Sequence, residues 1–168
     1  MGATGMQSSF FEDMVAEVLA LTGEDSPVKV RRALRNSCML SSDVSAAYDP
    51  LYPEVFEKKN TAYFGRGLVL NKYTGSRGKN GTSDANAEYV AKVRNVFDNN
   101  HVAFQTAELG KVDQGGGGTI AYVMANKAMS VIDSGVAVLS MHAPYEVTSK
   151  SDVYEVYRGY KAFLKDMK

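Results

Sequence analysis

Apolar residues recur three or four positions apart in several parts of the chain, a spacing typical of helices that bury one face. The pattern predicts helices over residues 10–22, 28–35, 83–98, 120–127 and 149–168. The first helix is expected to begin with a capping box formed by Ser9 and Glu12 and to lie on a sheet. Thr119 is expected to cap the helix over residues 120–127.

Short apolar runs rich in β-branched residues separate these helices and indicate strands. They cover residues 37–40, 65–72, 101–106 and 135–141, the last entered through an expected turn at residues 133–135. Residues 73–82 are rich in glycine and polar side chains and are expected to form an exposed loop. Because no repeat or linker divides the chain, the alternating elements predict one layered α/β structure.

Composition excludes several functional classes. The 168 residues include 45% hydrophobic residues, and 19 basic residues balance 19 acidic ones, so wholesale disorder and a general attraction to nucleic acid are not expected. No apolar run is long enough to span a bilayer and no signal segment opens the chain, so no membrane association is expected. The single cysteine, Cys38, excludes an internal disulfide and suits a reducing compartment, so a cytoplasmic location is expected.

One basic group lies in the second predicted helix, where Arg31, Arg32 and Arg35 are close together. Nucleic-acid binding would favour aromatic residues among these charges, and there are none. The group is therefore expected to be a solvated helix face or a contact between subunits.

Two possible metal ligands follow predicted strands. Asp43 comes after the run at 37–40, and His142 comes after the run at 135–141. Strand ends meet along one edge of such a sheet, and carboxylate oxygen and imidazole nitrogen both suit zinc. A catalytic zinc needs three protein ligands, however, so spacing alone leaves the chemistry open. The alternative is a local role, in which Asp43 caps a turn over Val44–Tyr48 and Asp49 sets a turn before Pro50.

Other kinds of site find less support. A serine nucleophile would be Ser140 or Ser149, but no Gly-x-Ser-x-Gly motif is present. Cys38 lacks a nearby histidine, and its apolar neighbours favour burial. The glycine run at 115–118 lacks the Lys-Ser/Thr ending of a nucleotide loop and favours a segment of close backbone approach at a substrate site. His101 is expected to be a surface histidine.

Four separated motifs, taken together, resemble one known family. They are Met-Gly-Ala-x-Gly at residues 1–5, Ser-Ser-Asp-Val at 41–44, Asp-Gln-Gly-Gly-Gly-Gly-Thr at 113–119 and Ser-Met-His-Ala-Pro-Tyr-Glu at 140–146. In this order they resemble the aminopeptidase I and aspartyl aminopeptidase family of zinc metallopeptidases. The resemblance covers residues 1–168, which correspond to the C-terminal portion of the family's catalytic domain.

The resemblance implies a partial domain of a three-layer sandwich, with helices on both faces of a mixed β-sheet, and removal of N-terminal residues from peptides. It also implies a two-zinc site, with cobalt or manganese as possible replacements, in which Asp43 and His142 are one terminal ligand to each metal. The general-base glutamate is expected upstream of Met1, so this chain is expected to be inactive alone. A homo-oligomer of twelve subunits is implied for the full-length family, and a non-catalytic assembly or interaction module is the alternative.

Further roles are expected from the same resemblance. Gly116 and Gly117 would place backbone beside the metals, where a larger side chain would block the substrate's first residue. Lys72 is a candidate for contact with substrate or a neighbouring subunit, and Asp49 stands where some relatives carry a substrate-contacting histidine. Glu146 is expected to support the loop of His142 without binding metal itself.

Overall fold

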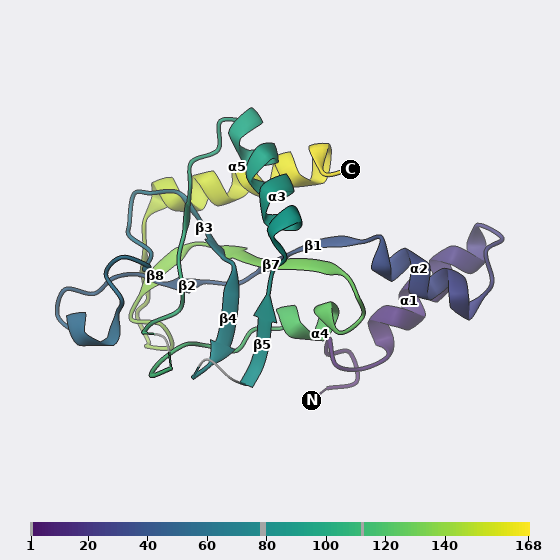
Figure 1. Cartoon of the computed structure of the whole chain (residues 1–168), viewed down its shortest axis with the longest axis horizontal. Coiled ribbons are helices and arrows are strands. Elements are labelled where there is room, and N and C mark those ends of the chain that lie inside the picture. The colour runs from purple at the N-terminus through teal and green to yellow at the C-terminus, as the bar shows by residue number, and fades with distance from the viewer. Residues whose placement is uncertain (1, 78–79, 112) are drawn as a thin grey trace.

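The computed structural model describes residues 2–77, 80–111 and 113–168, and a four-stranded sheet lies at its centre (Figure 1). The order across this sheet is β1 (Cys38–Ser42), β7 (Ser130–Gly135), β3 (Leu68–Asn71) and β6 (Phe104–Thr106). β1 and β7 are parallel, β3 and β6 are parallel, and β3 and β7 are antiparallel. The sheet is therefore mixed.

Two strands of this sheet, β1 and β7, are each followed by a further strand. β2 (Ser45–Ala46) follows β1, β8 (Ala137–Leu139) follows β7, and these two continuations are again parallel. β9 (Val147–Thr148) returns antiparallel to β8. The strand expected over residues 135–141 was misplaced, because the chain is already extended from Ser130 and its pairing is interrupted at Val136. The turn expected at residues 133–135 is instead the end of β7.

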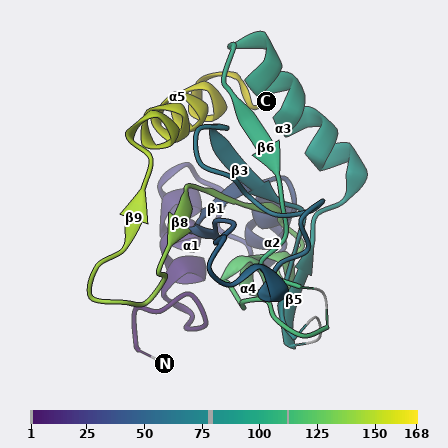
Figure 2. The same ribbon diagram turned by 90° about the vertical axis from the view of Figure 1, so that its left-hand side faces the viewer.

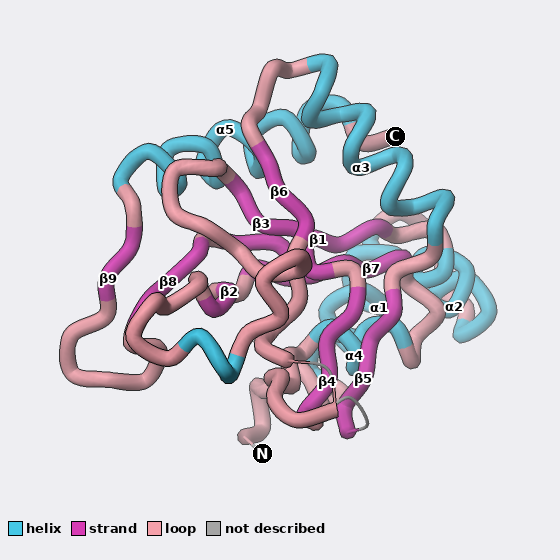
Figure 3. The backbone as a smooth tube through the Cα atoms, turned by 60° about the vertical axis from the view of Figure 1, so that its left-hand side comes forward, coloured by secondary structure: helices cyan, strands magenta, loops and turns pink. Residues whose placement is uncertain are grey.

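Helices cover both faces of the four-stranded sheet (Figures 2 and 3). α3 (Ala87–Asn99) and α5 (Lys150–Asp166) pack on one face, where Leu68, Leu70 and Ile132 meet Phe97 and Val93. α4 (Ala121–Ala125) packs on the other, against Val131. Alternate side chains of a strand point to opposite faces, so both faces are apolar. The expected architecture is confirmed.

The first two helices depart from that expectation. α1 (Phe10–Leu21) and α2 (Pro27–Arg35) pack against each other and project away from the sheet (Figure 1). α1 has no buried residue, and its apolar stripe is between 49% and 87% exposed at Phe10, Met14, Val18 and Leu21. The prediction that it lies on the sheet was wrong, because periodicity identifies a face to be covered but not what covers it. The expected capping box is also absent, since Ser9 has helical dihedrals and makes no side-chain cap.

Residues 73–82 were expected to be an exposed loop; residues 78 and 79 lie outside the described residues, and the others belong to a β-hairpin instead. Its strands are β4 (Tyr73–Ser76) and β5 (Asn80–Asp84), and Thr74 and Ser83 are buried. The helix expected to open at Ser83 begins later, at Ala87, because the side chain of Asn86 caps it by accepting from the Tyr89 N–H at 2.7 Å. Polar and glycine-rich strands lack the apolar alternation on which the prediction depended.

Two smaller features complete the fold. Cys38 is exposed rather than buried, because it opens β1 at the edge of the sheet. A short 3-10 helix covers Pro53–Val55. Across the described ranges 2–77, 80–111 and 113–168, none of the helices combines the length and apolar character needed to cross a membrane.

Asp152 joins the last helix to the central sheet. It is 1% exposed, and its two carboxylate oxygens accept from the N–H groups of Gly65 and Gly67, each at 2.8 Å. Gly67 has a φ of 84°, and a Cβ there would lie 2.0 Å from the carbonyl oxygen of Ala103. These contacts fix the start of β3 against the first turn of α5.

Candidate metal and substrate site

Asp43 lies in the two-residue break between β1 and β2. Its Oδ1 accepts from the N–H of Val44 at 2.8 Å, and its own N–H donates to the carbonyl of Ser134 at 3.3 Å. Its carbonyl oxygen lies against Gly135, where an added Cβ would be only 1.7 Å away. The turn predicted over residues 44–48 is absent, because Ser45 and Ala46 form β2. The Asp43 side chain is held at the exposed surface by its own backbone neighbour.

His142 is exposed in the loop that joins β8 to β9. Figure 2 shows this loop at the margin of the molecule. The φ of His142 is 70°, and that of Ser140 is 56°, so two non-glycine residues of this loop have left-handed backbone. Such residues are uncommon and need support from their surroundings. The support comes from Glu146, whose Oε1 accepts from the backbone N–H of His142 at 2.6 Å.

Asp43 and His142 flank the same pair of parallel strands. Asp43 precedes β2, His142 follows β8, and Ser45 pairs with Ala137 between them. β8 has three residues and therefore extends about 10 Å at roughly 3.3 Å per residue. No hydrogen bond or ion pair joins Asp43 to His142, both of which are described. Their shared binding to one metal cluster stays a prediction.

The donor atoms fit zinc, which accepts carboxylate oxygen and imidazole nitrogen. They do not complete a site, because a catalytic zinc has three protein ligands. Within residues 2–77, 80–111 and 113–168, no group of three or more histidine, cysteine, aspartate or glutamate side chains could hold a metal ion. The chain thus presents two donors of the right chemistry and needs at least one more.

The glycine run packs closely on the β4–β5 hairpin. Gly116 has a φ of 99°, and a Cβ there would lie 2.4 Å from the carbonyl oxygen of Gly75, whereas one on Gly117 would lie 3.4 Å from the Leu109 side chain. The close approach at Gly116 is therefore to the protein's own backbone. Further along, Gly118 and Thr119 line a groove together with Asp43. The substrate roles of Gly116 and Gly117 remain predictions.

Lys72 and Asp49 have local partners. Lys72 forms an ion pair with Asp84, and both side chains are largely exposed. Nearby, burial raises the pKa of Glu108, while a hydrogen bond from Asn60 lowers it. Asp49 Oδ1 accepts from the N–H of Leu51 at 2.8 Å. This hydrogen bond forms the turn predicted for Asp49 and Pro50. Their contact with substrate stays a prediction.

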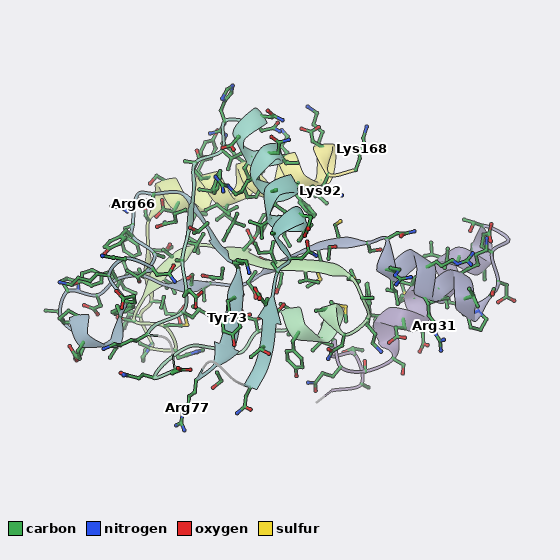
Figure 4. All side chains as sticks on the ribbon, viewed as in Figure 1. Arg31, Arg66, Tyr73, Arg77, Lys92 and Lys168 are labelled. Atoms are coloured by element: carbon green, nitrogen blue, oxygen red, sulfur yellow. The ribbon has the colours of Figure 1, made fainter. Side chains whose placement is uncertain are left out.

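The basic group of α2 is exposed on the projecting pair of helices, where Figure 4 shows Arg31 pointing away from the sheet. Arg31, Arg32 and Arg35 line a groove with Lys127, which is itself paired with Glu12. His101 is exposed at the end of α3, as predicted. Neither feature belongs to the groove of Asp43.

Sequence reasoning missed a buried carboxylate next to this groove. Asp133 is 1% exposed, and its Oδ2 accepts from the hydroxyls of Thr74 at 2.8 Å and Thr119 at 2.9 Å. Burial raises the pKa of Asp133, the hydrogen bonds from Thr74 and Thr119 lower it, and the charge of Asp43 raises it. The signal in the sequence was an acidic residue between two apolar stretches, residues 131–132 and 136–139.

Comparison with known proteins identifies the family of the chain. Residues 1–164 match the family described as aminopeptidase I zinc metalloprotease (M18). The probable M18 family aminopeptidase 1 of Clostridium acetobutylicum is 61% identical over 166 residues, which cover 99% of this chain and 36% of that protein. The crystal structure of aminopeptidase I from the same organism has a TM-score of 0.86 at 62% identity, covering 98% of this chain and 35% of that one.

The Thermotoga maritima M18 aminopeptidase structure has a TM-score of 0.93 at 43% identity, covering 98% of this chain and 37% of that one. The present chain thus spans little more than a third of the length of these relatives. The resemblance carried by the four sequence motifs is confirmed. The chain belongs to the M18 family of aminopeptidase I zinc metalloproteases.

Proposed function

We propose that this chain is the C-terminal portion of the catalytic domain of a metal-dependent aminopeptidase, which releases N-terminal residues from peptides. The observation that carries the proposal is the placement of Asp43 and His142 beside one parallel strand pair, each in a loop fixed by its own hydrogen bond. Because the chain spans 36% of its Clostridium relative, the activity is proposed for a polypeptide that also supplies the remaining ligands.

In that site Asp43 and His142 would each hold one metal ion. A bound pair of zinc ions, or of cobalt or manganese ions in their place, would polarise the peptide carbonyl and make a bound water molecule more acidic. Asp43 contributes a carboxylate already oriented by the Val44 N–H, and Glu146 holds the backbone of His142. The general base is proposed to be a glutamate outside residues 1–168.

The groove beside Asp43 would receive the start of the peptide. Its wall at Gly118 is open, because a Cβ there would meet no atom within 4 Å. Gly116 and Gly117 would keep the adjoining backbone free of side chains, and Lys72 and Asp49 are proposed as more distant contacts. The loop thus gives room for a substrate residue next to the proposed metal ligand.

A non-catalytic assembly module is the second candidate, and the exposed stripe of α1 favours it. Phe10, Met14, Val18 and Leu21 form an apolar face that a monomeric protein would usually cover. A homo-oligomer would bury such a face in either function. The two candidates therefore differ in catalysis and metal content rather than in assembly.

The test uses a chimaera in which residues 1–168 replace the matching segment of the Clostridium acetobutylicum relative. Zinc content and release of N-terminal residues from peptides are measured. Asparagine tolerates left-handed backbone, so His142→Asn removes the imidazole with little backbone strain. His101→Asn is the matched control, because His101 is also exposed and has a φ of 52°.

We expect His142→Asn to lower kcat/KM by about 100-fold or more, because a lost metal ligand removes several kcal/mol of transition-state stabilisation. His101→Asn should match the parent chimaera. Equal activity and zinc content in the two variants would contradict the ligand role. A folded chimaera without zinc and without activity would favour the assembly module.

A further inference from the structure

We propose that Asp133 is a positioning residue for this site, and that its buried carboxylate holds the glycine loop in place beside Asp43. The inference rests on the proposed aminopeptidase function for its catalytic consequence. Its structural part concerns only how residues 113–121 are attached to the sheet, and it can be tested without activity.

The carboxylate joins three segments that are distant in sequence. Asp133 lies in β7, Thr74 in β4 and Thr119 directly after the glycine run. Both threonine hydroxyls donate to the same oxygen, Oδ2, and their Oγ1 atoms are 3.5 Å apart. Each hydroxyl has a single hydrogen, so both donors are engaged by Asp133 and both side chains are oriented by it.

The same short stretch of β7 also positions Asp43. Asp133 pairs with Ser41 in the β1–β7 register, two residues before Asp43. Gly135, two residues after Asp133, receives the carbonyl of Asp43 in close contact. β7 therefore contacts the backbone of Asp43 through Gly135 and binds the hydroxyl of Thr119 through Asp133.

The consequence appears in the groove. Thr119 lines it together with Asp43 and Gly118, while its hydroxyl is bonded behind the groove to Asp133. The Thr119 Oγ1 also accepts from the Ala121 N–H at 3.2 Å, which links the loop to the start of α4. Loss of the carboxylate would free the loop while leaving the side chain of Asp43 intact.

Asp133→Ala tests this directly, because it leaves two buried hydroxyl donors without their acceptor. Asp133→Asn keeps one carbonyl oxygen that can accept from both threonines. Thr119→Val removes only the loop's hydroxyl, at nearly the same volume. Asp152→Ala is the matched control, because Asp152 is equally buried and also accepts two hydrogen bonds, but from Gly65 and Gly67.

The chimaera carries each variant, and two quantities are measured: amide hydrogen exchange along the chain, and KM and kcat with a peptide substrate. For Asp133→Ala and Thr119→Val we expect about tenfold faster exchange at residues 114–121 and a KM raised more than kcat is lowered. In Asp133→Asn, the exchange rate at residues 114–121 and the KM should both lie close to those of the parent chimaera. Asp152→Ala should change exchange near residues 65–67 and leave KM at the parent value.

In Asp133→Ala, exchange that is faster by the same factor along the whole chain, with KM unchanged, would overturn the proposal, because Asp133 would then act only on global stability. If Asp133→Ala does not fold, Thr119→Val decides the question. If the parent chimaera is inactive, the proposed function fails, and the exchange pattern alone still decides: faster exchange confined to residues 114–121 supports the attachment, and an unchanged pattern there overturns it.

Discussion

The backbone carbonyl oxygen of Asp43 lies 1.7 Å from the position that a Cβ atom on Gly135 would occupy. No side chain fits in that space. Glycine is therefore required at position 135 for β7 to lie this close to the backbone of Asp43. The contact fixes the backbone of a proposed metal ligand from a neighbouring strand.

Gly135→Ala should therefore lower the free energy of unfolding by about 1–3 kcal/mol, as expected for overpacking, because the backbone of Asp43 must move. Urea denaturation at neutral pH measures the change. Gly118→Ala is the matched control, since a Cβ on Gly118 meets nothing within 4 Å, and its unfolding free energy should stay within about 1 kcal/mol of the parent. Equal effects of the two substitutions would refute the close-contact explanation.

Glu146→Ala should loosen the loop of His142, because the N–H of His142 loses its 2.6 Å acceptor. In the active chimaera we expect zinc affinity to fall by about tenfold, the lower end of the effect of removing groups that support metal ligands. Glu146→Gln keeps an acceptor oxygen and should lose less. Titration with a zinc chelator measures the affinity, and Glu57→Ala, on another exposed glutamate, should leave it unchanged.

Asp152→Ala should lower the free energy of unfolding by about 3 kcal/mol, because two hydrogen bonds to a buried carboxylate are lost. Thermal and urea denaturation of the isolated chain measure the change. Asp98→Ala removes an exposed carboxylate from α3 and should change the value by less than about 0.5 kcal/mol. A small effect at Asp152 would mean that the loop of Gly65 and Gly67 is held by other contacts.

Tyr89→Phe should change how stability depends on alkaline pH. The Tyr89 hydroxyl donates to the carbonyl of Met39 at 2.9 Å in a buried position. Burial raises the pKa of Tyr89, and the charge of Cys38 raises it further. A raised pKa means that the folded state holds the proton more tightly. The resulting stability is complete below the ordinary tyrosine pKa of about 10 and is lost as the pH rises above it.

The variant should lose about 0.5–1.5 kcal/mol at neutral pH through the missing hydrogen bond, and its stability should fall less steeply than that of the parent above pH of about 10. Urea midpoints measured from neutral to alkaline pH give both values. Tyr145→Phe, on a side chain that is 88% exposed, should follow the parent profile. Identical slopes for Tyr89→Phe and the parent would contradict the contribution assigned to this hydroxyl.

The sequence alone was enough to predict that the segments of α3 and α5 form amphipathic helices. The stripes that became α3 and α5 identified their buried faces, because apolar spacing follows directly from helical geometry. The four motifs also identified the family, since their residue types and order are properties of the chain alone. The positions of Asp43 and His142 after apolar strands followed from the same pattern, although β7 begins five residues earlier than the strand expected there.

Other features were decided only by tertiary contacts. The apolar stripe of α1 has helical spacing, yet it lies away from the sheet, because spacing does not specify a partner. The β4–β5 hairpin is held by Thr74 and by the fit of Gly116 against Gly75, neither of which produces an apolar pattern.

The sequence by itself determined the helical faces, the α/β class and the family, because these depend on residue type and local spacing. Only the tertiary structure decided that Asp133 would be buried and bonded to Thr74 and Thr119, and that Gly135 would lie under Asp43. Those contacts join residues up to about ninety positions apart, and their energies depend on distances of a few ångströms that no local pattern encodes.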